Sequence, residues 1–405
     1  MDAMLRQDAD YIINQSIAAV MPDQAVKAAL AGKTFPGKVI LVAAGKAAWR
    51  MAKAAYDCVS VDKGIVITKY DHAKGQIGNL IIREGAHPTP DENGFSATRE
   101  ALELVKGLTE ADTVLFLLSG GGSALFELPL ISGEELQDIT KQLLACGAEI
   151  GEINCIRKRL SAVKGGKFAL ACMPAKVYSI VLSDVLGDRL DVIASGPAYP
   201  DSSACKDAIS IAKRYGLRLS DRARELLHTE TPKMLTNVQT FVNGSVRILC
   251  RAAADAAGEL GYNPVLLTDS LCCEAKEAGK WLASELQKYG RPVALIAGGE
   301  TVVKLTGSGL GGRNQELALA AAPGIRGRTG TAVFSIGSDG TDGPTDAAGG
   351  YVDYTTADEL DNFGICLDAV LEDNDSYRAL KAVGGLVITG PTGTNVNDVA
   401  VALYK

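Results

Sequence analysis

The stretch TVLFLLSGGGSAL, residues 113–125, joins a short apolar run to three consecutive glycines. An apolar run of this length is typical of a strand that is buried on both faces of a parallel sheet. Three glycines directly after it leave backbone N–H groups without Cβ obstruction, which suits an anion. We therefore predict a loop for a carboxylate or phosphate, formed by Ser119, Gly120, Gly121, Gly122 and Ser123. A turn that only needs glycine backbone conformations is the alternative.

The same pattern recurs on both sides of this stretch. Short apolar runs alternate with segments of helical periodicity, such as residues 91–106 and 133–148. Strands that alternate with helices in this way form a parallel sheet with helices on both faces. The sequence thus predicts an α/β fold, with further strands at VILVAA (39–44), GIVIT (64–68), NLIIRE (79–84) and VYSIVLS (177–183).

Two domains are expected, because a chain of 405 residues exceeds the ~250 to 300 residues at which single cores stop growing. The periodicity fades in the polar stretch 229–245, which we interpret as the domain boundary. A second series of strands and helices follows, and VRILC at 246–250 is predicted as its first strand. The predicted domains are residues 1–235 and 245–405.

The charge and the apolar pattern exclude several classes of protein. A net charge of −7 without a basic stripe argues against binding of nucleic acid. No apolar run approaches the ~20 residues that span a bilayer, so we expect no membrane partner and a cytoplasmic location. The nine cysteines include no CxxC pair and suit neither a disulfide framework nor a zinc site. The sequence leaves the oligomeric state open.

Lys46 follows the predicted strand 39–44 and Gly45, where ligands of α/β sheets bind. Its ammonium could neutralise a phosphoryl group there. The segment is not a P-loop, because Ile40 and Ala47 stand where that motif needs glycine and Ser or Thr. An exposed lysine at a helix start is the alternative interpretation.

A second glycine-rich loop, GSGLGGRNQE, runs from Gly307 to Glu316 and contains a literal GxGxxG. The preceding TVVKLT is too polar for a typical dinucleotide-binding strand, and Arg313 would suit phosphate oxygens. We predict phosphate or nucleotide-phosphate binding here, with a dinucleotide site or a purely structural loop as alternatives. The predicted nucleotide contacts in this loop are Gly309, Gly311, Gly312 and Asn314.

Aspartates recur within glycine and proline turns in SIGSDGTDGPTDAAGG, residues 335–350. Carboxylates with this spacing could converge on a hard cation such as Mg²⁺. We predict Asp339 and Asp342 as metal ligands; aspartates that only hold a surface loop together are the alternative.

Basic residues gather in NCIRKRLSAVKGG, residues 154–166, on a predicted helix. A solvated helix face is the usual interpretation of such a run, and a pocket role for Asn154, Arg157 or Lys164 is the alternative. In SDVLGD, Asp184 and Asp188 end a strand, where one of them could accept a substrate proton or cap a turn.

The three histidines show no spacing for metal ligation or for a Ser-His-Asp set, so catalysis led by histidine is not expected. His87 lies in GAHPTPDENG directly before a proline, and we predict it to be a turn residue.

Taken together and in their order along the chain, the sequence motifs of this protein resemble those of the class II glycerate kinases, also called glycerate 2-kinases of the MOFRL family. The likeness spans nearly the whole chain. The strings include AAGKAA (43–48), EGAHPTPDENG (84–94), SGGGSAL (119–125), IASGP (193–197), GGETV (298–302), GGRNQE (311–316), GSDGTDGPTDAAGG (337–350) and TGPTGTNVND (389–398).

The resemblance implies ATP-dependent phosphorylation of the 2-hydroxyl of D-glycerate to 2-phosphoglycerate, with a divalent cation. It implies a Rossmann-like N-terminal domain, a smaller α/β C-terminal domain and an active site in the cleft between them. The essential basic pair of the family falls on Lys46 and Arg313. On this reading Asp339 and Asp342 hold Mg²⁺, and Asp184 or Asp188 orients or deprotonates the hydroxyl.

The remaining predicted contacts also rest on the resemblance to this family. Glycerate would bind to the loop 119–123 with Asn154 and Arg157, and the nucleotide would contact Lys164. Two rival functions remain: a hydroxypyruvate reductase that uses a nicotinamide cofactor, and a non-enzymatic sensor of small anions.

Overall fold

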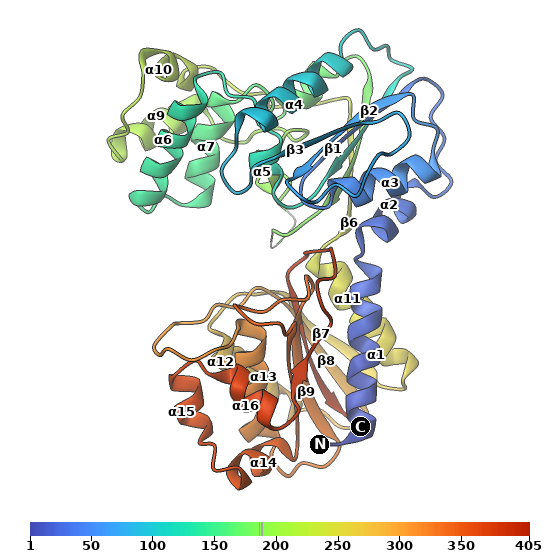
Figure 1. Cartoon of the computed structure of the whole chain (residues 1–405), viewed down its shortest axis with the longest axis vertical. Coiled ribbons are helices and arrows are strands. Elements are labelled where there is room, and N and C mark those ends of the chain that lie inside the picture. Colours follow the sequence, from blue (N-terminus) through green and yellow to red (C-terminus); the bar gives the residue numbers. More distant parts are fainter. Residues whose placement is uncertain (186, 188) are drawn as a thin grey trace. The chain divides into compact units, whose positions relative to one another are not determined.

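The computed structural model describes residues 1–405 except Leu186 and Asp188, so the predicted role of Asp188 lies outside the described residues. The chain divides into two compact units. Residues 22–243 form what we call the continuous unit, and residues 1–21 with 244–405 form the split unit (Figure 1).

The continuous unit is built on a six-stranded sheet with the strand order β3-β2-β1-β4-β5-β6. The ends of β1 and β4 are level, because Ala44 pairs with Leu118. This arrangement confirms the predicted parallel α/β sheet. Its parallel strands are β1 (Val39–Ala44), β2 (Lys63–Lys69), β3 (Ile81–Gly85), β4 (Thr113–Leu118) and β5 (Lys176–Leu182), and β6 (Val238–Gly244) lies beside β5.

Helices cover both faces of this sheet (Figure 1). Successive side chains of a strand point to opposite faces, so β1 contributes to two cores. Val39, Leu41 and Ala43 face α2 (Pro22–Leu30) and α3 (Ala48–Cys58). The alternate residues of β1 face α4 (Glu92–Leu104), α5 (Gly122–Leu125) and α8 (Lys167–Ala171).

A third apolar cluster holds a group of helices that lies away from the sheet. Leu136, Ile139 and Leu143 of one helix pack against Ile156 and Leu160 of another. A short 3₁₀ turn, η2 (Ile193–Ser195), contacts α5 and α7. The helices of this group are α6 (Gly133–Ala145), α7 (Ile150–Leu160), α9 (Cys205–Arg214) and α10 (Asp221–Leu227).

The split unit contains a mixed six-stranded sheet with the order β11-β10-β9-β12-β8-β7. The first two strands in sequence pair in parallel, and every other pairing is antiparallel. Because β12 is antiparallel to both of its neighbours, its first residue lies between the carboxyl ends of β8 and β9. The strands are β7 (Asn263–Leu271), β8 (Val293–Gly299), β9 (Thr331–Gly337), β10 (Gly349–Asp353), β11 (Leu386–Val387) and β12 (Asp398–Tyr404).

Helices of the split unit complete its core. In the described part of the chain, no helix is both long enough and apolar enough to cross a membrane. The helices are α1 (Ala3–Ala19), α11 (Val246–Glu259), α12 (Ala275–Leu286), α13 (Arg313–Ile325), α14 (Thr356–Asn362), α15 (Leu367–Glu372) and α16 (Ser376–Ala382).

The position of α1 differs from the predicted division at residues 235–245. Its buried face, which includes Leu5, Ile12 and Ile13, packs on α11 and β9 of the split unit (Figure 1). Asp8 accepts a hydrogen bond from the Tyr262 hydroxyl and forms an ion pair with Lys405, both at 2.6 Å. Long-range contacts of this kind leave no periodic signal in the sequence.

Two local predictions around the boundary are also wrong. Residues 246–250 begin α11 and are not a strand; Val246, Leu249, Cys250 and Ala253 are buried at helical spacing. Within the polar stretch, residues 238–244 form β6, because Val238 and Val242 pack against the core of the first sheet. The continuous unit therefore extends to residue 243.

Candidate functional site

In the continuous unit, the strand order reverses between β1 and β4, and ligands of open α/β sheets bind at such a point. The loops that follow these two strands contact each other. The Lys46 N–H donates to the Gly120 carbonyl at 2.8 Å, and the Ala47 N–H donates to Ser119 Oγ at 3.1 Å. A Cβ on Gly45 would lie 2.3 Å from Ser119 Oγ, so only glycine permits this approach. The two loops thus form one surface.

The predicted anion loop contains two backbone donors without a partner among the described residues. No described residue accepts a hydrogen bond from the N–H of Gly120 or of Gly121. Gly121 has a φ of +86°, which suits glycine. A Cβ added to Gly120 would lie 2.5 Å from Asp184 Oδ2, so this carboxylate lies over the loop. The structure therefore brings together Lys46, the glycine loop and Asp184, as predicted for a strand-end site.

His87 belongs to the same cluster, although the sequence predicted only a turn residue. A Cβ on Gly121 would lie 3.0 Å from Cδ2 of His87 and 3.2 Å from Cγ of Lys46. Burial, followed by the positive charges of Lys46 and Lys69, lowers the pKa of His87 below its ordinary value. The imidazole is therefore neutral at neutral pH. The signal that could have found it is its place just after β3, at the edge of the sheet that carries Lys46.

The predicted pocket residues of α7 support the loop from behind. Asn154 Oδ1 accepts a hydrogen bond from Ser195 Oγ at 2.8 Å, and Ser195 has a positive φ of 61°. An Arg157 Nη donates to the Ser123 carbonyl at 2.8 Å and lies 3.3 Å from Glu127. Asn154 is 4% exposed, so its role here is to hold the loop and the strained turn at 194–195.

Lys164, predicted as a nucleotide contact, has its partners inside the protein. This side chain is fully buried, and its Nζ donates to the carbonyls of Ser123, Phe126 and Ala194 at 2.9, 3.2 and 3.3 Å. It also lies 3.5 Å from the buried carboxylate of Glu127. Burial lowers the pKa of Lys164 to about 8, against the opposing charge of Glu127. Lys164 is a structural link between α5 and η2.

Lys164→Met is expected to lower the free energy of unfolding by about 3 kcal/mol, because it leaves Glu127 and three buried carbonyls without this donor. Urea unfolding followed by circular dichroism measures the change. Lys106→Met, at an exposed lysine paired with Glu103, is the matched control and should leave the midpoint unchanged. An unchanged midpoint in Lys164→Met would contradict the structural role.

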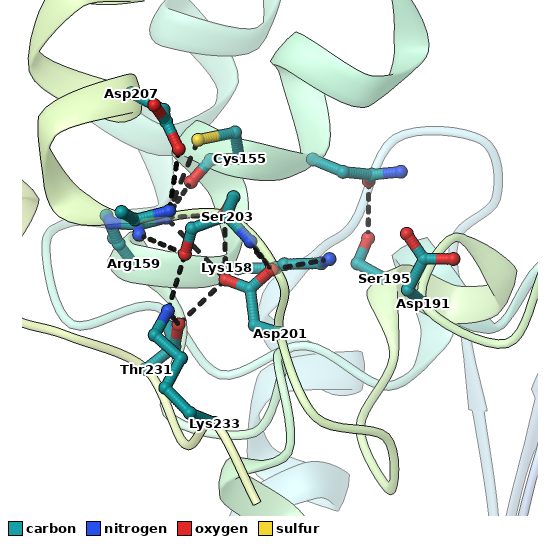
Figure 2. Close-up of polar contacts among 12 residues, drawn as sticks. Cys155, Lys158, Arg159, Asp191, Ser195, Asp201, Ser203, Asp207, Thr231 and Lys233 are labelled. Atoms are coloured by element: carbon teal, nitrogen blue, oxygen red, sulfur yellow. Dashed lines mark hydrogen bonds and ion pairs between the residues drawn. The ribbon is translucent and has the colours of Figure 1, made fainter.

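The other basic residues of α7 are buried too, which corrects the interpretation as a solvated face. Figure 2 shows Lys158 and Arg159 converging on Asp201. Lys158 Nζ lies 3.0 Å from this carboxylate, which also accepts from the Thr231 hydroxyl at 2.7 Å. Arg159 donates to Ser203 Oγ at 3.0 Å. This network fixes α7 to the segments around residues 201 and 231, and so holds Asn154, Arg157 and Lys164 in place.

In the split unit, Arg313 begins α13 beside the first residue of β12. Its Nε and Nη2 donate to the two oxygens of Asp398 at 2.6 and 3.0 Å, and its Nη1 lies 3.1 Å from Glu300. Burial raises the pKa of Asp398 to about 6, although the hydrogen bond from Arg313 opposes the shift. The Arg313 side chain remains 35% exposed, so part of the guanidinium is open to a ligand.

Glu300 and Asp398 are site residues that the sequence reasoning missed. Each lies in a string that carries the family resemblance, GGETV and TGPTGTNVND, and that was the available signal. The Asn397 side chain donates to the second oxygen of Glu300 at 3.1 Å. Arg313 is thus oriented by two carboxylates, of which one is itself held by an amide.

Asp342 caps α13, which corrects its prediction as a metal ligand. Its carboxylate accepts from the backbone N–H groups of Asn314 and Gln315 at 3.1 and 2.9 Å, and from both of their side-chain amides. Asn314 is 1% exposed and its Oδ1 accepts from Ser335, so the predicted nucleotide contact of Asn314 is also wrong. Both side chains anchor the start of α13.

Asp339 is the member of the predicted pair that stays available to a cation. It is partly exposed, and only its Oδ1 accepts a hydrogen bond from a described residue, the Thr341 N–H at 3.0 Å. Among the described residues no group of three or more His, Cys, Asp or Glu side chains could hold a metal ion. Of the predicted pair, only the carboxylate of Asp339 is therefore open to a cation in this conformation.

Much of the GxGxxG loop packs within the split unit. Its amides at residues 306–310 donate to Asp373, Asn374 and Asp375 at 2.8 to 3.0 Å. A Cβ on Gly309 or Gly311 would lie 2.5 or 2.2 Å from atoms of residues 373–376, and one on Gly312 would lie 2.3 Å from Asp342. The amides of residues 306–310 are therefore occupied in this conformation, so Gly309 has no free N–H for a nucleotide. No described residue accepts a hydrogen bond from the N–H of Gly311 or Gly312, and their nucleotide contact stays a prediction.

Two families match the chain, and together they cover most of it. Residues 8–228 match a domain of unknown function, DUF4147, and residues 293–398 match the MOFRL family. A curated relative from Thermotoga maritima, named D-glycerate 2-kinase, is 54% identical over 98% of this chain and 98% of its own length. The chain belongs to the class II glycerate kinase family.

Other members of the glycerate kinase family agree with this assignment. A relative from Pyrococcus horikoshii, named glycerate 2-kinase, is 41% identical over 97% of this chain and 96% of its own length. A crystal structure described as glycerate kinase from Thermotoga maritima matches with a TM-score of 0.95 at 52% identity, and each chain is covered completely. The family fold predicted from the sequence strings is therefore confirmed.

Proposed function

We propose that this protein transfers the γ-phosphoryl group of ATP to the 2-hydroxyl of D-glycerate, which gives 2-phosphoglycerate and ADP. The observation that carries this proposal is the surface at the ends of β1 and β4. There the side chain of Lys46, an exposed residue, adjoins Gly121, and no described residue accepts a hydrogen bond from the N–H groups of Gly120 and Gly121. Such a surface suits a small carboxylate and a phosphoryl group at the same time.

The proposed roles follow from charge and position. Phosphoryl transfer needs in-line positioning and cations around the equatorial oxygens, with little covalent work from the protein. Lys46 stabilises the transferring group, and the N–H groups of the loop 119–123 bind the carboxylate of glycerate. Arg157 holds this loop through the Ser123 carbonyl. Arg313 supplies a second cation for phosphate oxygens through its exposed part.

Asp339 fits a magnesium ion that is bound mainly through substrate phosphates. Mg²⁺ commonly takes one or two carboxylates and completes its shell with water and phosphate oxygens. Asp339 offers such a carboxylate, whereas both oxygens of Asp342 are occupied by α13. When bound, the ion would neutralise phosphate charge.

Asp339→Asn is expected to raise the Mg²⁺ concentration needed for half-maximal turnover about tenfold, because it removes one anionic ligand. The measurement is the rate of ADP formation against free Mg²⁺ at saturating ATP. Asp346→Asn, at an aspartate of the same loop that accepts a hydrogen bond from Tyr377, is the control. An unchanged requirement in Asp339→Asn would remove this residue from the metal site.

Product identification tests the function as a whole. With ATP, Mg²⁺ and D-glycerate, we expect one phosphorylated product, and its mass and NMR spectrum should place the phosphate on carbon 2. A 3-phosphate, or no phosphorylated product, would overturn the proposal.

The reductase alternative rests on a relative from Agrobacterium vitis that is named "Putative hydroxypyruvate reductase" and is 39% identical over 99% of this chain. The GxGxxG loop, its proposed dinucleotide site, has its amides bonded to residues 373–375. We therefore expect no change in NADH absorbance with hydroxypyruvate. A sensor of small anions would bind D-glycerate without consuming ATP.

A further inference from the structure

His87 is a histidine at the proposed site to which the sequence assigned no chemistry. It lies in the loop between β3 and α4 and is partly exposed. If Gly121 carried a Cβ atom, that atom would lie 3.3 Å from Nε2 of His87 and 3.2 Å from Cγ of Lys46. The imidazole edge and the lysine side chain therefore adjoin one face of Gly121. Neither ring nitrogen forms a hydrogen bond with a described residue.

We propose that His87 is the catalytic base that accepts the proton of the 2-hydroxyl of glycerate. This role rests on the proposed function, since it assumes that glycerate binds to the loop 119–123. A glycerate carboxylate on the N–H groups of Gly120 and Gly121 would leave its 2-hydroxyl, one carbon away, close to the face of Gly121. Of the atoms of the His87 ring, Cδ2 and Nε2 lie nearest to that face, so Nε2 is the nitrogen that is placed to accept the proton.

The step balances without another reactant. A bond forms between the 2-oxygen of glycerate and the γ-phosphorus of ATP, while the bond from that phosphorus to the β,γ-bridging oxygen breaks. ADP leaves with the electron pair of the broken bond. The hydroxyl proton passes to the imidazole and then to solvent, which reaches the partly exposed ring.

The charges around His87 favour this role. The groups that act on the imidazole are Lys46, Lys69 and His72, and burial acts in the same direction as these cations. All of them disfavour the imidazolium, so the ring enters the reaction neutral and ready to accept a proton. Lys46 thus has two effects, since its charge attracts phosphate oxygens and keeps the neighbouring base unprotonated.

Asp184 is the competing base. Its carboxylate lies over Gly120, one residue from the position that His87 adjoins. The two candidates differ in what they predict for pH. An imidazole loses its function as a base when the pH falls through its pKa, and the pKa of His87 is lowered, so kcat/KM should decline on an acid limb that lies below the ordinary range of a histidine.

The experiment measures turnover of D-glycerate against pH for the wild-type protein, His87→Ala, Asp184→Asn and a matched control, His228→Ala. His228 is exposed at the end of α10. We expect His87→Ala to lower kcat ~10²-fold with little change in KM for D-glycerate. It should also lose the acid limb and recover turnover when imidazole is added. Asp184→Asn and His228→Ala should keep the acid limb.

Several results would overturn the role. Full turnover in His87→Ala, or a raised KM at unchanged kcat, would make His87 dispensable or only a binding residue. Loss of the acid limb in Asp184→Asn together with its retention in His87→Ala would transfer the role to Asp184. If the wild-type protein forms no 2-phosphoglycerate, the proposed function and this role fail together. If it does and His87→Ala is fully active, only this role fails.

Discussion

Lys46→Met is expected to lower kcat for phosphorylation of D-glycerate ~10³-fold, the range found when one preorganised charge at a transferring phosphoryl group is removed. The substitution keeps an unbranched side chain of nearly the same length and removes the charged amino group. Nothing in the described part of the chain forms an ion pair or hydrogen bond with this ammonium, so no internal contact is lost. The thermal stability of the variant should therefore equal that of the wild type.

The measurement is steady-state ADP formation, with Lys53→Met as the control. Lys53 is on α3, the helix that begins just after Lys46, and is an exposed lysine paired with Asp57. Lys46→Arg should recover only part of the activity, because a planar guanidinium places its charge differently. Near wild-type turnover in Lys46→Met would end the assignment of the phosphoryl group to this surface.

Arg313→Met is expected to have two separate effects, a loss of turnover of ~10³-fold and a loss of about 2 kcal/mol in the free energy of unfolding. The first follows from the loss of a cation for phosphate oxygens. The second follows because Asp398, 8% exposed, loses its bidentate partner. The cost is lower than for a fully buried pair, since Arg313 is partly solvated and Asp398 can take up a proton.

The pH dependence of this stability loss has a definite sign. The pKa of Asp398 in the folded protein is already raised to about 6, and without Arg313 it rises further. The folded state then binds a proton more tightly than the unfolded state, so acid relieves the penalty. Urea unfolding should show a smaller deficit for Arg313→Met at pH 5.5 than at pH 7.5.

The double variant Arg313→Met/Asp398→Asn separates the two effects. It removes the unpaired charge, so stability should return towards that of the wild type while turnover stays low. Recovery of turnover in the double variant would show that Arg313 acts only through the fold. A fully active and stable Arg313→Met would contradict both roles.

The predictions that the structure confirms depend on local sequence pattern and on strand direction. The run at 113–118 became β4, and the placement of Lys46 and the loop 119–123 at strand ends held because parallel strands bring such loops to one edge. The predictions that failed depend on where a side chain points after folding. Lys164 and Asp342 lie in sequence motifs that suit a ligand site. In the folded protein, however, Lys164 pairs with Glu127, and Asp342 accepts hydrogen bonds at the N-terminus of α13.

His87 and the position of α1 illustrate the same limit. The contact of His87 with Gly121 joins loops 34 residues apart, and the ion pair of Asp8 with Lys405 spans 397 residues. Such contacts arise only when strands and helices have assembled. Single-sequence periodicity therefore located the strand-end surface but not the full set of side chains on it.

The packing of α1 against α11 and β9 has a consequence for biosynthesis. During translation the continuous unit is the first to be completed, as one uninterrupted segment, and it can fold when residue 243 has emerged. The apolar face of α1 must wait for partners that are synthesised after it, and β12 comes last. A circular permutant that starts at residue 22 and links Lys405 to Met1 would make both units sequential, and we expect it to refold with less aggregation.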